Sequence, residues 1–244
     1  MKLLNPNIFI IAYQYSVLVK YQNNMYRLKN RKYLPDLICT SGKINKKILS
    51  KHYSKYKIPI IIIGNNIGFK KLKNLDQFDN STHIQNKCLI IPEGISSEIK
   101  IMINFIIEYI NTYRNNTLFC IKSHPSYNKN FYEKNFNISK FNNIKFVLDD
   151  EFDVLDYGYF LHRGTSLSIN LASQKIKQIY LKTPDNIDIN PLFQIEKECT
   201  FVTKVSELDN IFANKIKYNP KLVNFSNNYF EKLNFNSLLS ILKK

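Results

Sequence analysis

Glycine is scarce in this chain, with only 6 among 244 residues, and several glycine-based fingerprints are missing. Neither GxGxxG after the first apolar run nor GxxxxGKS/T occurs, which disfavours a dinucleotide-dependent oxidoreductase and a P-loop NTPase. HExxH and GxSxG are absent as well, so a zincin and a standard α/β-hydrolase are also disfavoured. Any chemistry must therefore rest on other residues.

Cysteine is sparse and scattered. Cys39, Cys88, Cys120 and Cys199 are far apart, with neither CxxC spacing nor a neighbouring cluster of His and Cys. Such cysteines are typical of small buried hydrophobic residues. We therefore predict no metal site and no cofactor.

Long hydrophobic runs are also missing. The most apolar windows, residues 8–19 and 89–110, are interrupted by Asn, Gln, Glu or Lys well short of the roughly 20 apolar residues of a spanning helix. The start has no small-residue cleavage site after an apolar core, as a signal peptide would have. We expect a cytoplasmic location.

Acidic residues are nearly absent from the first third of the chain. Residues 1–75 hold 15 Lys and Arg against one acid, Asp36, whereas residues 76–244 hold 20 against 18. The local net charges are thus +14 and +2, and the basic part should attract a polyanion: an anionic inner-membrane surface, an acidic polysaccharide or nucleic acid. A lysine-rich surface that only faces solvent is the alternative, and both stay open.

What the chain does have is a series of short apolar runs typical of buried strands. Four of the six glycines, Gly42, Gly64, Gly94 and Gly164, come just after such runs. A fifth run, residues 118–121, ends in a Ser-His-Pro sequence instead. In a parallel α/β sheet ligands bind beyond the carboxyl ends of strands, where glycine lets backbone N–H groups approach an anion.

The spacing of these runs predicts two α/β domains. Residues 1–70 form a partial amino-terminal segment, residues 71–87 a linker, and residues 88–244 a Rossmann-like domain. Within the second domain strands alternate with helices, including a long helix over 96–113 and a closing helix over 228–242. Because parallel strands need crossover connections, this α/β chain should form a parallel sheet covered on both faces.

The strand over 157–161 leads into the most suggestive sequence. Gly164 permits close approach, while the hydroxyls of Thr165, Ser166 and Ser168 and the first helical amides can bind phosphate oxygens. Arg163 adds a bidentate cation. The alternative is an ordinary helix cap.

Two other strand ends carry candidate catalytic residues. His124, fixed by Pro125, can donate to a phosphate or protonate a leaving group, although a simple turn is the alternative. Glu93, before Gly94, can act as a general base or can simply favour a helix N-terminus.

A further strand end, near residue 148, is acidic. Asp149, Asp150 and Glu151 can contact a ribose or base, with a solvated acidic turn as the alternative. Taken together, the candidate strand ends predict one cleft for a nucleotide sugar.

Residues 12–181 resemble the bacterial surface-carbohydrate (capsule or lipopolysaccharide) biosynthesis proteins, which are similar to GT-B glycosyltransferases such as sialyl- and polysialyltransferases and teichoic-acid polymerases. The matching stretches, in order, are residues 12–16 (AYQYS), 35–42 (PDLICTSG), 92–98 (PEGISSE), 122–125 (KSHP), 162–166 (HRGTS) and 177–181 (KQIYL). The resemblance implies a GT-B carboxyl-terminal domain that binds a nucleotide sugar, with His124, Thr165 and Ser166 near the phosphate. Two features depart from the family: only part of an amino-terminal acceptor domain is present, and Tyr15 stands where a histidine is expected.

We therefore expect a glycosyltransferase that transfers sugar from a nucleotide donor to a glycan or lipid-linked acceptor, with inversion and without a metal, since no Asp-x-Asp motif occurs. Peripheral membrane association would use the basic residues 1–75. Two alternatives stay open. One is a non-catalytic nucleotide-sugar-binding subunit or truncated remnant, for which a partner chain supplies the missing domain; the other is a nucleic-acid-binding protein.

Overall fold

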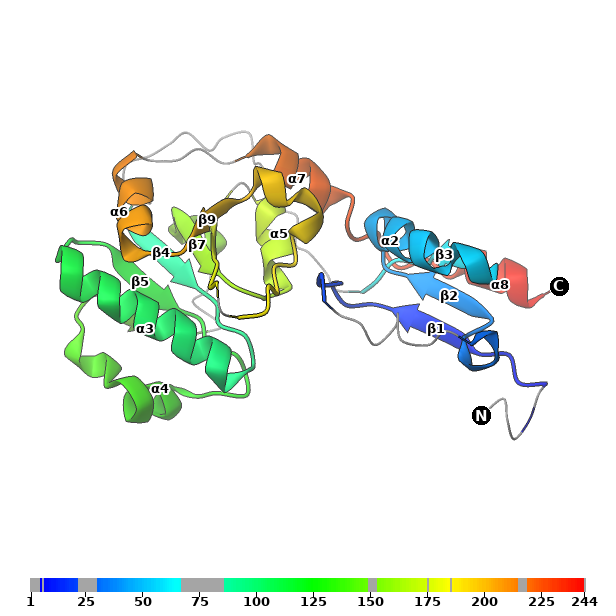
Figure 1. Cartoon of the computed structure of the whole chain (residues 1–244), viewed down its shortest axis with the longest axis horizontal. Helices are drawn as coiled ribbons and strands as arrows, with labels where there is room; N and C mark the ends of the chain where they lie inside the picture. The colour runs from blue at the N-terminus through cyan, green and yellow to red at the C-terminus, as the bar shows by residue number, and fades with distance from the viewer. Residues whose placement is uncertain are drawn as a thin grey trace. The chain divides into compact units, whose positions relative to one another are not determined.

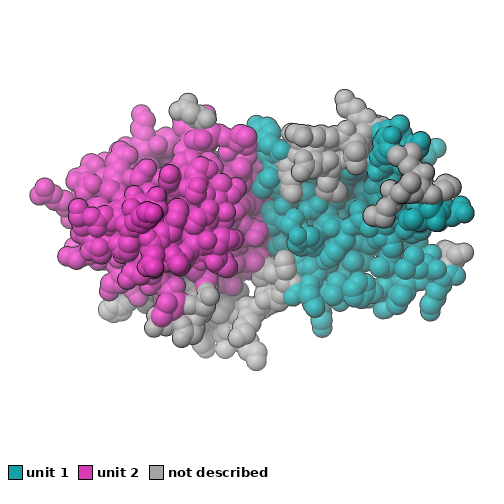
Figure 2. Space-filling model, turned by 90° about the horizontal axis from the view of Figure 1, so that it is seen from below, with its two compact units in different colours: residues 1–70, 224–244 teal, residues 71–223 magenta. Residues whose placement is uncertain are grey.

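The computed structural model describes residues 5, 7–21, 30–66, 86–148, 153–174, 176–184, 186–214 and 219–243. The chain divides into two compact units (Figure 2). Unit 1 comprises residues 1–70 and 224–244, and unit 2 comprises residues 71–223. The predicted linker, residues 71–87, lies almost entirely outside the described residues. The closing residues 224–244, which we had grouped with the second domain, belong by their contacts to unit 1.

Unit 1 contains a parallel sheet of three strands in the order β1-β2-β3 (Figure 1). The strands are β1 (Ile11–Gln14), β2 (Leu37–Thr40) and β3 (Ile60–Ile62). Helix α2 (Lys43–Tyr53) forms the crossover from β2 to β3, and its Leu49 and Tyr53 pack with Ile38 and Ile60 on one face of the sheet. Burial of these apolar side chains, each contributing about 1.5–3 kcal/mol, holds this layer together.

The carboxyl-terminal segment completes unit 1. Helix α7 (Pro220–Asn227) ends before Tyr229, and the chain then runs along the ends of β2 and β3. There the amide of Glu231 donates to the Ser41 carbonyl at 2.8 Å, and the Asn65 amide donates to the Glu231 carbonyl at 2.9 Å. Helix α8 (Asn236–Leu242) follows, so the single helix predicted over 228–242 is wrong. The backbone groups of this stretch bond to distant loops rather than to each other.

Two glycines allow this approach. Gly64 has a φ of 75°, a left-handed conformation that a side chain would strain. A Cβ at Gly42 would collide with the backbone carbonyl of Tyr229. Both therefore serve the packing of the returning segment in unit 1.

Unit 2 is built on a parallel sheet of six strands in the order β6-β5-β4-β7-β8-β9. The strands are β4 (Lys87–Ile90), β5 (Leu118–Ile121), β6 (Ile144–Phe146), β7 (Tyr159–His162), β8 (Lys177–Leu181) and β9 (Thr200–Val202). From β4 the chain first adds β5 and β6 on one side and later adds β7, β8 and β9 on the other. The strand order therefore reverses beside β4, which creates a topological switch point between β4 and β7.

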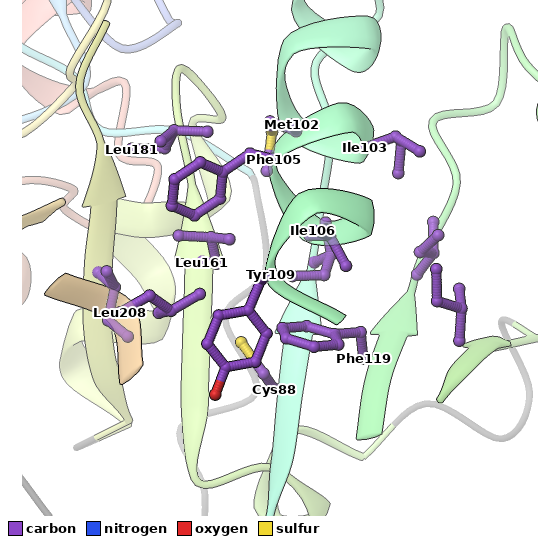
Figure 3. Packing of buried hydrophobic residues seen from close by; sticks show 14 of the residues in the cluster. Cys88, Met102, Ile103, Phe105, Ile106, Tyr109, Phe119, Leu161, Leu181 and Leu208 are labelled. Carbon is purple, nitrogen blue, oxygen red and sulfur yellow. The ribbon is translucent and has the colours of Figure 1, made fainter. Parts of the chain in front are cut away.

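Helices cover both faces of this sheet (Figure 1). On one face lie α3 (Ser96–Tyr113), α4 (Lys129–Phe136) and α6 (Val205–Asn214), and on the other lies α5 (Leu167–Ser173). Figure 3 shows Phe105 and Tyr109 of α3 packed over Leu161, Cys88 and Phe119 of the sheet. Short 3-10 turns complete the described elements: Arg31–Tyr33, Ser54–Tyr56, Ile138–Lys140, Val154–Asp156 and Phe193–Glu198. This is the covered parallel α/β sheet that the alternation of strands and helices predicted.

Candidate functional site

Three of the predicted strand ends meet at one edge of the unit 2 sheet. β5, β4 and β7 are neighbours and parallel, and their carboxyl ends lead into His124, Glu93 and Gly164, respectively. In such sheets this edge, beside the switch point, is where ligands bind. The structure thus brings these residues to a common rim.

His124 and Gly94 are in direct contact. A Cβ at position 94 would lie 2.7 Å from Cε1 of the His124 ring and 2.9 Å from each ring nitrogen. No side chain fits in this space unless the ring moves, so the imidazole lies directly against the backbone of the loop that follows β4. The absence of a side chain at Gly94 is therefore explained by the histidine.

A turn fixes the orientation of the His124 ring. The Ser126 amide donates to Nδ1 at 3.2 Å, and the Tyr127 amide donates to the His124 carbonyl at 2.9 Å. Because Nδ1 accepts, the neutral ring carries its proton on Nε2. Pro125 is exposed and shapes this turn. His124 can therefore offer an Nε2–H donor to a ligand.

Glu93 lies against the neighbouring loop. A Cβ at Gly164 would sit 3.1 Å from Cγ of Glu93, so the two strand ends touch. Burial raises the pKa of the Glu93 carboxyl, and the nearby charge of Glu98 raises it further. A carboxylate in this environment is a stronger base than an exposed one, as general base catalysis requires.

Arg163 is placed differently from the expectation of a phosphate-binding cation. Its side chain is only 1% exposed, and Nε donates to the Glu98 carboxylate in an ion pair. Nη1 donates to the Leu181 carbonyl at 3.0 Å and to Oγ1 of Thr183 at 2.7 Å. The guanidinium thus joins β7, the end of β8 and the first turn of α3 from within the unit.

The three predicted hydroxyls have different environments. Oγ1 of Thr165 accepts from the Leu167 amide at 3.3 Å, so this buried residue helps to begin α5. Ser168 is buried, and its carbonyl accepts from Nε2 of Gln178 at 2.7 Å. Ser166 is exposed and is the one of the three that solvent reaches freely. Asp149, Asp150 and Glu151 lie outside the described residues.

The loop between β8 and β9 adds a residue that we did not predict. Ile189 packs against Gly164, since a Cβ at position 164 would lie 2.5 Å from its Cδ1. Asp188 anchors this loop: it accepts from the Tyr180 hydroxyl at 2.7 Å and from the Asn190 amide at 3.1 Å. The backbone of Gly164 is therefore covered by Glu93 and Ile189, whereas the Ser166 side chain is exposed and the His124 ring is partly exposed.

Glu98 was likewise missed as a site residue. Its only signal in the sequence was an acid in the first turn of a helix, a placement that the helix dipole favours anyway. Nothing in the sequence indicated that Ile189 would pack against Gly164, because their contact joins two loops from different parts of the chain.

No protein-family model matches the chain, and no curated protein sequence matches it significantly. Solved structures match its fold. The UDP-GlcNAc 2-epimerase from Neisseria meningitidis bound to UDP-GlcNAc is 15% identical, with a TM-score of 0.52 over 94% of this chain and 68% of that chain. The S. aureus MnaA-UDP co-structure is 14% identical, with a TM-score of 0.50 over 86% of this chain and 59% of that chain. The glycotransferase of kitacinnamycin is 8% identical, with a TM-score of 0.49 over 80% of this chain and 50% of that chain.

The two higher-scoring likenesses confirm the predicted fold class, an α/β chain with a GT-B-like fold, in which the structure shows parallel sheets of three and six strands. At this identity they show the fold alone. The chain spans between 50% and 68% of the length of these three structures. Among the described residues, no helix is both long and apolar enough to cross a bilayer.

Proposed function

We propose that unit 2 binds a nucleotide-activated sugar at the carboxyl ends of β5, β4 and β7, and that the chain acts in sugar transfer for surface polysaccharide synthesis. The observation that carries this proposal is the meeting of His124, Gly94 and Glu93 at the switch point of a parallel sheet. The fold-level neighbours bound to UDP-GlcNAc and to UDP support a nucleotide sugar as the ligand class.

The proposed chemistry assigns one role to each side of the rim. An acceptor hydroxyl attacks the anomeric carbon while Glu93 takes its proton, and the bond from that carbon to the nucleotide phosphate oxygen breaks. The phosphate leaves with the electron pair, and its negative charge is met by Nε2–H of His124 and by the exposed Ser166 hydroxyl. One displacement of this kind inverts the anomeric centre and needs no metal.

The acceptor side is proposed to lie with unit 1. Its residues carry 16 Lys and Arg against 2 acids, a net +14 that suits an anionic glycan or a lipid-linked acceptor at the inner-membrane surface. Capsule or lipopolysaccharide synthesis and a likeness to sialyltransferases remain parts of this proposal that rest on the sequence resemblance.

A second candidate function is a nucleotide-sugar-binding subunit that works with a partner chain. The observation that favours it is that β1, an edge strand in the described part of the unit 1 sheet, carries partly exposed apolar side chains. In this version the site of unit 2 binds the donor, and the partner supplies the rest of the acceptor domain.

Calorimetry with CMP-, UDP- and GDP-sugars, paired with a chromatographic assay for donor hydrolysis, separates these functions. Binding with slow hydrolysis supports the transferase, whereas binding without hydrolysis supports the subunit. His124→Ala should weaken binding about tenfold or more through loss of a charge-assisted contact, while His52→Ala on α2 of unit 1 is the matched control. If no donor binds, or if nucleic acid alone binds above physiological salt, both versions are wrong.

A further inference from the structure

Two successive residues at the end of β7 each contact a different glutamate. Gly164 touches the Glu93 side chain, and Arg163 binds the Glu98 carboxylate in an ion pair. Glu93 precedes α3 and Glu98 lies in its first turn, so both glutamates and both of their partners lie at the junction of β4, α3 and β7. Two contacts, Gly164 with Glu93 and Arg163 with Glu98, therefore hold this junction together, and we call this pair of contacts the clamp.

The Arg163 side chain is fixed too firmly to act as a mobile ligand cation. Beyond the ion pair, it donates to Leu181 and Thr183 at the end of β8, and its side chain is 1% exposed. Breaking such a buried pair by removing one partner leaves the other charge uncompensated, which is strongly unfavourable. The contacts of Arg163 therefore hold the Glu98 carboxylate in place.

We propose that Arg163 and Glu98 are positioning residues for Glu93: the guanidinium holds the Glu98 carboxylate in the first turn of α3, at the junction where Gly164 touches Glu93, and this fixed pair of charges sets the electrostatic environment in which Glu93 works. This inference rests on the proposed function of Glu93 as a base. It adds a pair of residues that contact neither donor nor acceptor but decide the pH range in which the base works.

The charged groups around Glu93 come from each element packed on it. α3 contributes Glu98, β7 contributes Arg163, the loop after β5 contributes the His124 ring against Gly94, and the loop after β8 contributes Asp188 next to Ile189. Of these, Glu98 raises the pKa of Glu93, second to burial itself. A positive charge on Arg163 offsets the Glu98 charge, so the two members of the pair push the Glu93 proton in opposite directions.

The test measures the titration of Glu93 by carboxyl NMR on the full chain without nucleotide. Glu98→Gln removes the negative charge and should lower the Glu93 midpoint by about half a pH unit or more. Arg163→Met leaves Glu98 uncompensated and should raise the midpoint by a similar amount. Opposite shifts are the signature, because a purely structural role for the pair would disturb Glu93 in the same way in both variants.

Two controls accompany these variants. Glu108→Gln removes an exposed acid from the same helix, and Thr183→Val removes an Arg163 contact without changing any charge; neither should move the midpoint. The wild type provides a measurement that does not depend on the folding of variants, since burial should hold the Glu93 midpoint above the ordinary value of a glutamate. A Glu93 midpoint at or below that ordinary value, or shifts of one sign in both variants, would overturn the inference.

The titration is independent of the proposed function, because it uses no donor. If the wild type binds no nucleotide in calorimetry but the two variants still shift the Glu93 midpoint in opposite directions, the proposed function is rejected and the positioning role of Arg163 and Glu98 is retained. Conversely, normal donor binding with an unmoved Glu93 midpoint would reject the clamp and keep the function. In the functional protein the same variants should shift the acid limb of the rate profile, in the directions given above.

Discussion

Unit 1 and unit 2 share the parallel α/β pattern but differ in the number of strands in their sheets and in their net charge. In unit 2, β4 lies inside a sheet of six strands with helices on both faces, and its residues carry 19 Lys and Arg against 17 acids. In unit 1, three strands leave β1 at an edge, and the net charge is +14. Almost all of the net positive charge of the chain therefore lies in unit 1.

Among the described residues of unit 1, several exposed apolar side chains lie in and beside β1. Register pairs Ile11 with Leu37 and Tyr13 with Cys39, so these side chains share the face on which α8 packs. α8 covers Leu37, Cys39 and Ile63, whereas Phe9, Ile11, Tyr13 and Tyr15 are 38–60% exposed. Parallel sheets normally have both faces covered. Among the described residues, the unit 2 sheet therefore has helices on both faces, whereas unit 1 exposes apolar side chains in and beside its edge strand β1.

Tyr229→Ala should have the largest effect and should act on unit 1 alone. Tyr229 is buried, and its hydroxyl accepts from the Leu18 amide at 3.1 Å, so its loss leaves a cavity and an unpaired donor. We expect unit 1 to lose about 3–5 kcal/mol. Hydrogen exchange should show faster exchange in residues 37–63 with unchanged protection in residues 87–121. Equal loss in both units would contradict the independence of the two sheets.

Gly94→Ala should break the site of unit 2 without unfolding it. A methyl group at this position forces the His124 ring away, and we expect donor affinity to fall about tenfold, or about 1.4 kcal/mol. Ser97→Ala, an exposed change in the first turn of α3, is the control. Unchanged affinity in calorimetry would show that His124 does not need its position against the loop.

Glu93→Gln should stabilise unit 2 at neutral pH. Because the folded pKa of Glu93 is raised, its ionisation costs stability as the pH rises from the ordinary glutamate pKa through the raised value. The variant removes this cost and should be more stable than the wild type at pH 7, with no gain near pH 4. Urea unfolding at both pH values checks the sign; a variant less stable than the wild type at pH 7 would contradict it.

Ile11→Lys should have the smallest effect on folding and should act on association. A charge on an edge strand discourages pairing with another chain, and the Ile11 side chain is 38% exposed, so stability should change by about 1 kcal/mol or less. Sedimentation at rising protein concentration should show less self-association than the wild type. Tyr33→Lys, exposed outside β1, should behave like the wild type. Equal self-association of the wild type, Ile11→Lys and Tyr33→Lys would show that the β1 edge does not mediate association.

Local sequence patterns correctly predicted elements whose formation depends mainly on residues near one another in the sequence. The sequence predicted a helix over 96–113, and the structure has it at Ser96–Tyr113. The prediction of one closing helix was wrong because the backbone of residues 229–234 forms hydrogen bonds with Ser41, Ile63 and Asn65, and no local sequence pattern indicates such contacts. Hydrophobic periodicity cannot show that a segment returns to the other end of the chain.

The site divides in the same way. The sequence placed Glu93, His124 and Gly164 at strand ends, and parallel pairing then brought them together. It could not tell that Arg163 turns inward, because that orientation depends on Glu98 and on Thr183 in the loop after β8. Which side chain at a strand end faces a ligand and which faces the core is set by tertiary partners.

Amide NMR shift mapping with UDP, CMP and GDP tests the central claim most directly, since each nucleotide probes the rim without a need for the correct sugar. One of them should shift the amides of residues 93–95, 123, 124, 126, 127 and 163–166 together and should leave those of β1 and β2 unmoved. Shifts confined to unit 1, or no shift with any nucleotide at millimolar concentration, would contradict the assignment of a donor site to the ends of β5, β4 and β7.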